Sequence, residues 1–133
     1  MRYFLGCDVS KAKVDVSLVD AVGVEQLADI VPNTAVDMAT FLLTLVGQYP
    51  TDELTCVVES TACFHHPAVE ASVALDIPCL VLNPIITKQQ IKATIRGKKT
   101  DRTDATMIAR LGLRGEGRLH TPEPYIATKY LCP

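Results

Sequence analysis

Long apolar runs are missing from this 133-residue sequence, and so is the basic-then-apolar start of a secretory signal. A helix that crosses a bilayer needs about 20 consecutive, mainly apolar residues, and a signal peptide needs a charged start before its apolar segment. We therefore predict no membrane partner and a cytoplasmic location. CxxC spacing is also absent among the five cysteines, which predicts buried, reduced thiols in place of a zinc site or a disulfide framework.

Basic residues are absent between Val14 and Thr87, a segment that contains ten acidic residues. The segment from Lys88 to Arg118 contains nine basic and three acidic residues, an excess of six positive charges. The net charge of -2 at pH 7 hides this separation. A one-sided basic segment is typical of a surface that faces a polyanion, although charge alone leaves a solvated helix face as an equal alternative.

The apolar pattern predicts the element order β-β-β-α-β-α-β-α. A mixed α/β sheet with helices packed on its faces follows from a meander of three strands and later alternating strands and helices. The second strand, from Lys13, alternates between apolar and polar residues and is predicted to be half-buried. We expect residues 1–118 to form the domain and residues 119–133, which contain three prolines and no periodicity, to be a linker.

Helix boundaries follow from caps and breakers. Asn33 or Thr34 is expected to cap a helix that ends near Gln48, and Ser60 or Thr61 is expected to cap the next one. A short helix is expected at residues 87–95, and helical spacing predicts a further helix from Asp101 to Leu113.

Four acidic residues stand where strands end or a helix begins. Asp8 and Glu59 each follow an apolar strand, and sites in such sheets form beyond the carboxyl ends of the strands. Asp101 and Asp104 lie one turn apart at a helix start. Each acid alone fits a turn or a helix cap. Together, oxygen ligands of this kind suit Mg²⁺ or Mn²⁺, as one ion or as a pair. The basic residues expected to contact phosphate are Lys11, Lys98, Lys99 and Arg102.

The segments GCDVSK, VESTACF, VLNP and KKTDRTDA occur in the order and spacing of one known family. The sequence resembles the DEDD transposases of the insertion-sequence-one-ten family and the related Piv-type DNA invertases. This resemblance implies a RuvC-like fold of the ribonuclease-H-like class. It implies that Asp8, Glu59, Asp101 and Asp104 form an acidic tetrad that binds Mg²⁺ for cutting and rejoining DNA. The sequence departs from the family pattern at Ala62 and Phe64, where the family usually has glycine and tyrosine.

The resemblance also implies partners. A guide RNA encoded by the mobile element would direct recombination, the active form would be a homo-oligomer (dimer or tetramer), and a C-terminal domain outside this chain would supply a serine nucleophile. Two other functions stay open from the residues alone. One is an actin-like ATPase half-domain, which would need more glycine-rich phosphate loops than seven scattered glycines provide. The other is a non-catalytic module for nucleic-acid binding or oligomerisation.

Overall fold

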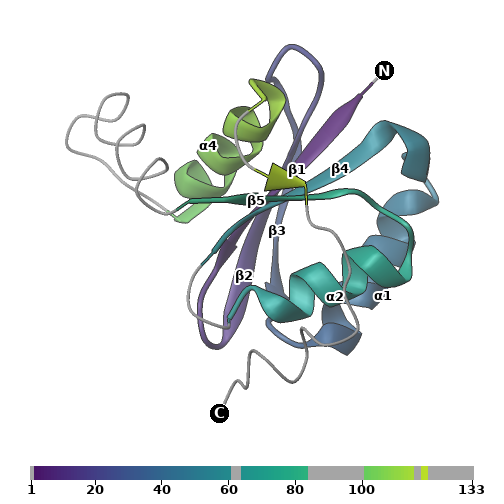
Figure 1. Ribbon diagram of the computed structural model, residues 1–133, viewed down its shortest axis with the longest axis vertical. Coiled ribbons are helices and arrows are strands. Elements are labelled where there is room, and N and C mark those ends of the chain that lie inside the picture. Colours follow the sequence, from purple (N-terminus) through teal and green to yellow (C-terminus); the bar gives the residue numbers. More distant parts are fainter. Residues whose placement is uncertain (1, 61–63, 84–100, 116–117, 120–133) are drawn as a thin grey trace.

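Six strands in one sheet form the centre of the structure, and helices cover both faces of that sheet (Figure 1). The computed structural model describes residues 2–60, 64–83, 101–115 and 118–119. The strands are β1 (Tyr3–Val9), β2 (Lys13–Val19), β3 (Glu25–Pro32), β4 (Leu54–Glu59), β5 (Cys79–Leu82) and β6 (Arg118–Leu119). The helices are α1 (Ala35–Val46), α2 (His66–Ala74) and α4 (Asp101–Leu113), with a 3-10 turn at Thr51–Glu53.

The strand order across the sheet is β3-β2-β1-β4-β5-β6. β1, β2 and β3 form an antiparallel meander, β4 pairs parallel with β1, and β5 pairs parallel with β4. The predicted mixed sheet is therefore confirmed. β6, which pairs antiparallel with β5, is absent from the predicted order because two residues are too few to show a period. It reaches Leu119, and the residues of the expected linker after Leu119 lie outside the described part.

Side chains of the central strands alternate between two cores. Leu5 and Cys7 of β1 pack in the core shared with α1 and α2, whereas Phe4 packs with α4 on the opposite face. β4 follows the same rule, since Cys56 belongs to the first core and Val57 to the second. Figure 1 shows this layering, with α4 on one side of the sheet and α1 and α2 on the other. Every second residue of β1 and β4 therefore faces α4.

The prediction of a half-buried second strand is wrong. All of Val14 to Val19 in β2 is buried, including the polar residues Asp15 and Ser17. The alternating pattern does separate an apolar face from a polar face, but both faces are covered. The apolar face packs in the core with α1 and α2. α4 packs over the polar face of β2, where Thr106 and Ser17 lie with their hydroxyl oxygens 2.9 Å apart. The polar face of β2 is thus part of the layer between the sheet and α4.

The first helix begins as predicted and the second does not. Thr34 caps α1 by accepting a hydrogen bond from the backbone N–H of Asp37 at 3.0 Å. α2 begins at His66, after a cap at His65 that makes no side-chain hydrogen bond, so neither Ser60 nor Thr61 is its cap. The reason is Pro67. A helix that began at residue 60 or 61 would place the proline ring against a carbonyl of the preceding turn, whereas Pro67 fits the first turn of α2.

The predicted last helix is confirmed with the bounds Asp101–Leu113, and the short helix expected at residues 87–95 lies outside the described residues. None of the helices that the structure describes combines the length and the apolar character of a membrane span. α4 lies very close to the sheet because two contact points are glycines. A Cβ on Gly6 of β1 would overlap the carbonyl oxygen of Ala105 and the backbone nitrogen of Ala109, and a Cβ on Gly112 of α4 would overlap Val57.

Three of the predicted buried thiols meet in the core under α1 and α2. Cys7, Cys56 and Cys79 are free and buried, as predicted, while Cys63 and Cys132 lie outside the described residues. The sulfur atoms of Cys7 and Cys56 are 3.7 Å apart. The hydrogen bond with the Cys56 thiol, together with burial, raises the pKa of Cys7, and the same two causes raise the pKa of Cys79.

Hydrogen bonds with Cys7 and Cys79 lower the pKa of Cys56, so its protection depends on burial alone. We predict that none of the three thiols reacts in the folded protein, because a reagent in water does not reach the buried sulfur atoms, and because the thiolate, which is the nucleophile, is scarce at Cys7 and Cys79. In a Cys63→Ser, Cys132→Ser variant, we expect a disulfide reagent such as Ellman's reagent to label no thiol in native buffer and three in urea. Absorbance of the released thiolate measures this directly. Rapid labelling of Cys7 or Cys79 without denaturant would contradict the burial.

Candidate active site

Asp8 and Glu59 are neighbours at the carboxyl ends of two parallel strands. The parallel register of β1 and β4 runs from Tyr3 opposite Leu54 to Cys7 opposite Val58. The next residue on each strand is Asp8 on β1 and Glu59 on β4, so these two stand side by side. Adjacent strands lie about 4.8 Å apart. Because Gly6 and Val57, two residues earlier, contact α4, Asp8 and Glu59 belong to the same face of the sheet. Both side chains are partly buried.

The first residues of α4 approach this same end of the sheet. Near its C-terminus, α4 is fixed to the turn between β2 and β3, where Arg110 Nε donates to the carbonyl oxygen of Gly23 at 3.0 Å. That turn lies next to the amino end of β1, because Val19 pairs with Phe4. The middle of α4 crosses β1 at Gly6. The start of α4, with Asp101 and Asp104 in its first turns, therefore lies toward the end where β1 and β4 finish.

The side chains of Asp101, Arg102 and Asp104 are outside the described part of the structure, as are Lys98 and Lys99. Lys11 is exposed in the turn between β1 and β2. Among the side chains that are described, no group of three or more His, Cys, Asp or Glu residues has the geometry of a metal site. The structure thus brings together Asp8 and Glu59 and brings the backbone of Asp101 and Asp104 toward them.

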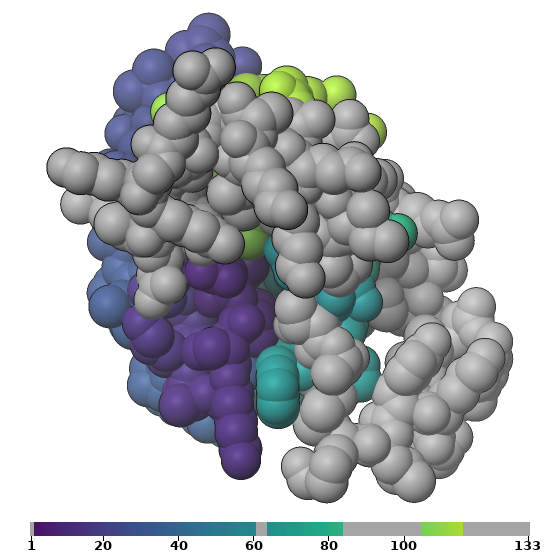
Figure 2. Space-filling view, turned by 90° about the vertical axis from the view of Figure 1, so that its left-hand side faces the viewer, coloured from purple at the N-terminus to yellow at the C-terminus, as the bar shows by residue number. Residues whose placement is uncertain are grey.

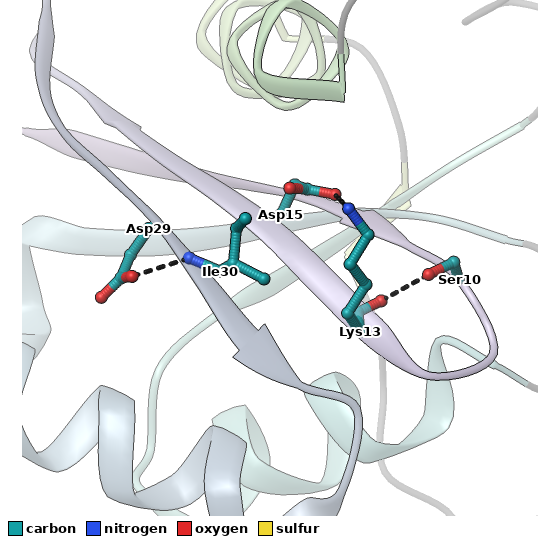
Figure 3. Close-up of polar contacts among 5 residues, drawn as sticks. All are labelled: Ser10, Lys13, Asp15, Asp29 and Ile30. Carbon is teal, nitrogen blue, oxygen red and sulfur yellow. Dashed lines mark hydrogen bonds and ion pairs between the residues drawn. The ribbon is translucent and has the colours of Figure 1, made fainter.

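A third carboxylate, which was not among the predicted site residues, lies beside this pair. Asp15 of β2 stands directly opposite Asp8 of β1, so Asp15, Asp8 and Glu59 form a row across three strands on the face toward α4. The side chain of Asp15 is only 9% exposed, and its Oδ2 lies 3.3 Å from Lys13 Nζ (Figure 3). The sequence signals for this pairing are the alternation of β2, which places Asp15 on its polar face, and the short turn that joins β2 to β1.

Asn33, considered only as a helix cap, connects the two strand ends. Its Nδ2 donates to the carbonyl oxygen of Ser10, in the turn after β1, at 2.7 Å and to that of Phe64, in the loop after β4, at 2.9 Å. Its Oδ1 is buried with no hydrogen-bond partner among the described residues. In Figure 2, purple residues of the N-terminal hairpin and teal residues that follow β4 lie side by side on the face shown. Asn33 therefore holds the ends of β1 and β4 in place relative to one another.

A small polar network fixes α4 over β2. Ser17 and Thr106 both donate to Glu25 Oε1, at 3.0 and 3.2 Å, and the two hydroxyls lie 2.9 Å from one another. Ser17 is fully buried, so these hydrogen bonds satisfy groups that water does not reach. The network sets the position of α4 along the sheet and, with it, the position of Asp101 and Asp104.

The arrangement has known structural relatives. The structure of T. thermophilus RuvC in complex with a Holliday junction substrate matches with a TM-score of 0.66 at 11% identity, over 90% of this chain and 100% of that chain. A second Thermus thermophilus RuvC structure matches with a TM-score of 0.63 at 11% identity, over 89% of this chain and 99% of that one. At this identity the likeness establishes the fold alone. No curated protein matches the sequence.

The fold is thus RuvC-like, of the ribonuclease-H-like class, with acidic residues at the ends of its first and fourth strands. The family of IS110-type DEDD transposases, described as transposases, matches residues 5–128, so the chain belongs to that family. The expected resemblance, fold and transposase function are confirmed. The family and the fold support a DNA-cleaving enzyme, and they imply DNA binding and the use of a divalent metal.

Proposed function

We propose that Asp8, Glu59, Asp101 and Asp104 form one acidic tetrad that binds Mg²⁺, or Mn²⁺ in its place, for strand cleavage and transfer in transposition. The observation that carries this proposal is the in-register placement of Asp8 and Glu59 beneath the start of α4. Two partly buried carboxylates side by side repel one another, and a divalent cation offsets that repulsion. All four donors are carboxylate oxygens, the ligands that Mg²⁺ prefers.

The chain's own residues then have separate tasks. Asp8 and Glu59 offer oxygens from rigid strands, and Asn33 keeps those strand ends together. Asp101 and Asp104 come from a helix whose distance from the sheet is fixed by Gly6. A bound divalent ion would supply charge stabilisation to a phosphate undergoing displacement. Lys11, Lys98, Lys99 and Arg102 are proposed to hold the neighbouring phosphates of the DNA.

Several finer parts of the function are also proposals. The family membership favours an element-encoded guide RNA and a dimer or tetramer as the active form. Residues 1–118 are proposed as the catalytic domain, with residues 119–133 as the linker to a domain that carries the serine nucleophile. A cytoplasmic location fits an enzyme that acts on DNA and stays a prediction.

The tetrad is tested by isothermal titration with Mn²⁺ and Mg²⁺. We expect binding by the wild type and loss of binding in an Asp8→Asn, Asp101→Asn variant, which removes one ligand from β1 and one from α4. An Asp29→Asn, Asp52→Asn variant is the matched control, since it removes the same charge from exposed positions. Undiminished binding in the Asp8→Asn, Asp101→Asn variant would refute the shared site.

A further inference from the structure

Lys13 and Asp15 form an ion pair that the proposed tetrad does not include. Lys13 Nζ lies 3.3 Å from Asp15 Oδ2, and the two side chains differ in exposure: 43% for Lys13 and 9% for Asp15 (Figure 3). The backbone of Lys13 is held as well, since its carbonyl oxygen accepts from the Ser10 hydroxyl at 2.8 Å and from the Ser10 backbone N–H at 2.9 Å. The result is an ammonium group that is fixed at its base and at its tip and still reaches solvent.

The pair lies beside the proposed metal ligands. Asp15 stands directly opposite Asp8 in the antiparallel register of β1 and β2, which places their Cβ atoms about 5 Å apart on the same face. The next residue of β1, Val9, pairs with Val14, so Lys13 is level with the turn that ends β1. The ammonium of Lys13 is therefore at the rim of the row formed by Asp15, Asp8 and Glu59.

Burying the Asp15 carboxylate beside Asp8 costs free energy unless a favourable interaction offsets that cost. A third carboxylate increases the repulsion in the row, and an apolar residue such as Val19, on the same face of the same strand, packs under α4 without that cost. The one cation that the described ion pairs give to Asp15 is Lys13. The consequence of this ion pair is that the position of the Lys13 side chain is fixed before any ligand binds.

We propose that Asp15 is a positioning residue that holds Lys13 at the rim of the tetrad, where the Lys13 ammonium contacts a non-bridging phosphate oxygen of the bound DNA. This rests on the proposed function, because the phosphate is the one brought to the metal site. A phosphate that approaches three carboxylates is repelled, and a fixed cation at the rim offsets this repulsion. Holding the lysine beforehand also removes part of the entropy that ordering a free side chain would lose.

The salt dependence of DNA binding measures the contact of Lys13. Each phosphate neutralised by a cation contributes about 0.9 to the slope of log K against log salt on duplex DNA. We expect Lys13→Gln to lower the slope for a fluorescent DNA duplex by about 0.9 at constant Mg²⁺, and Lys13→Arg to restore it, because the charge returns. An unchanged slope in Lys13→Gln would overturn the proposal.

The direction in which Asp15→Asn changes DNA affinity tests the role of Asp15. If Asp15 were only a negative charge near a polyanion, Asp15→Asn would strengthen DNA binding. If it positions Lys13, the same variant weakens binding, by about threefold, since the lysine regains its freedom. Asp29→Asn is the matched control: Asp29 is exposed and pairs with Val16, so its side chain lies on the opposite face of the sheet, and its removal should strengthen binding slightly. Tighter binding by Asp15→Asn contradicts a positioning role.

Metal titration separates this inference from the proposed function. Lys13→Gln should retain Mn²⁺ binding, which Asp8→Asn, Asp101→Asn loses. If the tetrad variant loses the metal while Lys13→Gln keeps the wild-type slope, the metal site stands and the role of Lys13 is wrong. If the wild type binds the metal but shows no salt-dependent duplex binding, the metal site stands and the DNA contact of Lys13 is wrong. Should Asp15→Asn not fold, as thermal melting would show, Lys13→Gln and Lys13→Arg still decide, because the Lys13 side chain is substantially exposed.

Discussion

Replacing Gly6 by alanine is expected to detach α4 from the sheet, although the change adds one methyl group. The added Cβ would overlap the carbonyl oxygen of Ala105 and the backbone nitrogen of Ala109. Both are backbone atoms within a helix, so no side-chain rotation relieves the overlap, and the helix must move as a whole. Overpacking of a core usually costs about 1–3 kcal/mol, and we expect a loss of free energy of unfolding at or above the top of that range.

Movement of α4 should also abolish metal binding, even though no proposed ligand is altered. Asp101 and Asp104 are carried by α4, and a shift of the helix separates them from Asp8 and Glu59. Urea unfolding followed by circular dichroism measures the stability, and Mn²⁺ titration of the folded variant measures the site. A Gly6→Ala variant with wild-type stability and wild-type metal affinity would contradict the close approach of helix and sheet.

Gly47 provides the matched control for this substitution. It caps the C-terminus of α1 with φ -67° and ψ -22°, a conformation that alanine adopts readily, and it is exposed. A Cβ there would meet only the carbonyl oxygen of Thr44 at 3.3 Å. Gly47→Ala should therefore leave the stability unchanged or raise it by about 0.4–1 kcal/mol, since it restricts the unfolded chain.

Local signals in the sequence were sufficient for most of the fold. The cap at Thr34, the bounds of α4 and the strands that end in Asp8 and Glu59 each depend on a few adjacent residues, which is the range over which caps and periodicity act. The juxtaposition of Asp8 and Glu59 followed from a general rule, that sites in crossover sheets form beyond the carboxyl ends of strands. The rule needs only the order of the elements.

Features that depend on distant contacts could not be predicted in this way. The burial of Asp15 and Ser17 requires α4, which lies more than 80 residues further along the chain, to cover the polar face of β2. Asn33 likewise forms its hydrogen bonds with Ser10 and Phe64, on two different loops. Periodicity identifies the polar face of a strand. It does not show whether that face contacts water or is covered by a helix that brings polar groups of its own.

Replacing Glu59 by glutamine is expected to remove the stabilisation that a divalent metal gives the folded protein. A ligand that binds only the folded state stabilises it by about 2.7 kcal/mol at 100 times its dissociation constant, which corresponds to a rise in Tm of roughly 10 °C for a domain of this size. The wild type should show this rise with Mg²⁺. Glu59→Gln should not, because the proposed site loses the carboxylate that stands beside Asp8.

The same variant is expected to be at least as stable as the wild type in EDTA. Without metal, Asp8 and Glu59 are like charges on adjacent strands, partly buried and in register, so neutralising one of them relieves repulsion. Glu70→Gln, the same chemical change on the exposed side of α2, should keep the full Mg²⁺ response. Thermal melting of the three proteins with and without Mg²⁺ gives all the values needed. A Glu59→Gln variant that is destabilised in EDTA and still gains the full Tm shift with Mg²⁺ would show that Glu59 is a structural carboxylate and that the metal, if bound, is held elsewhere.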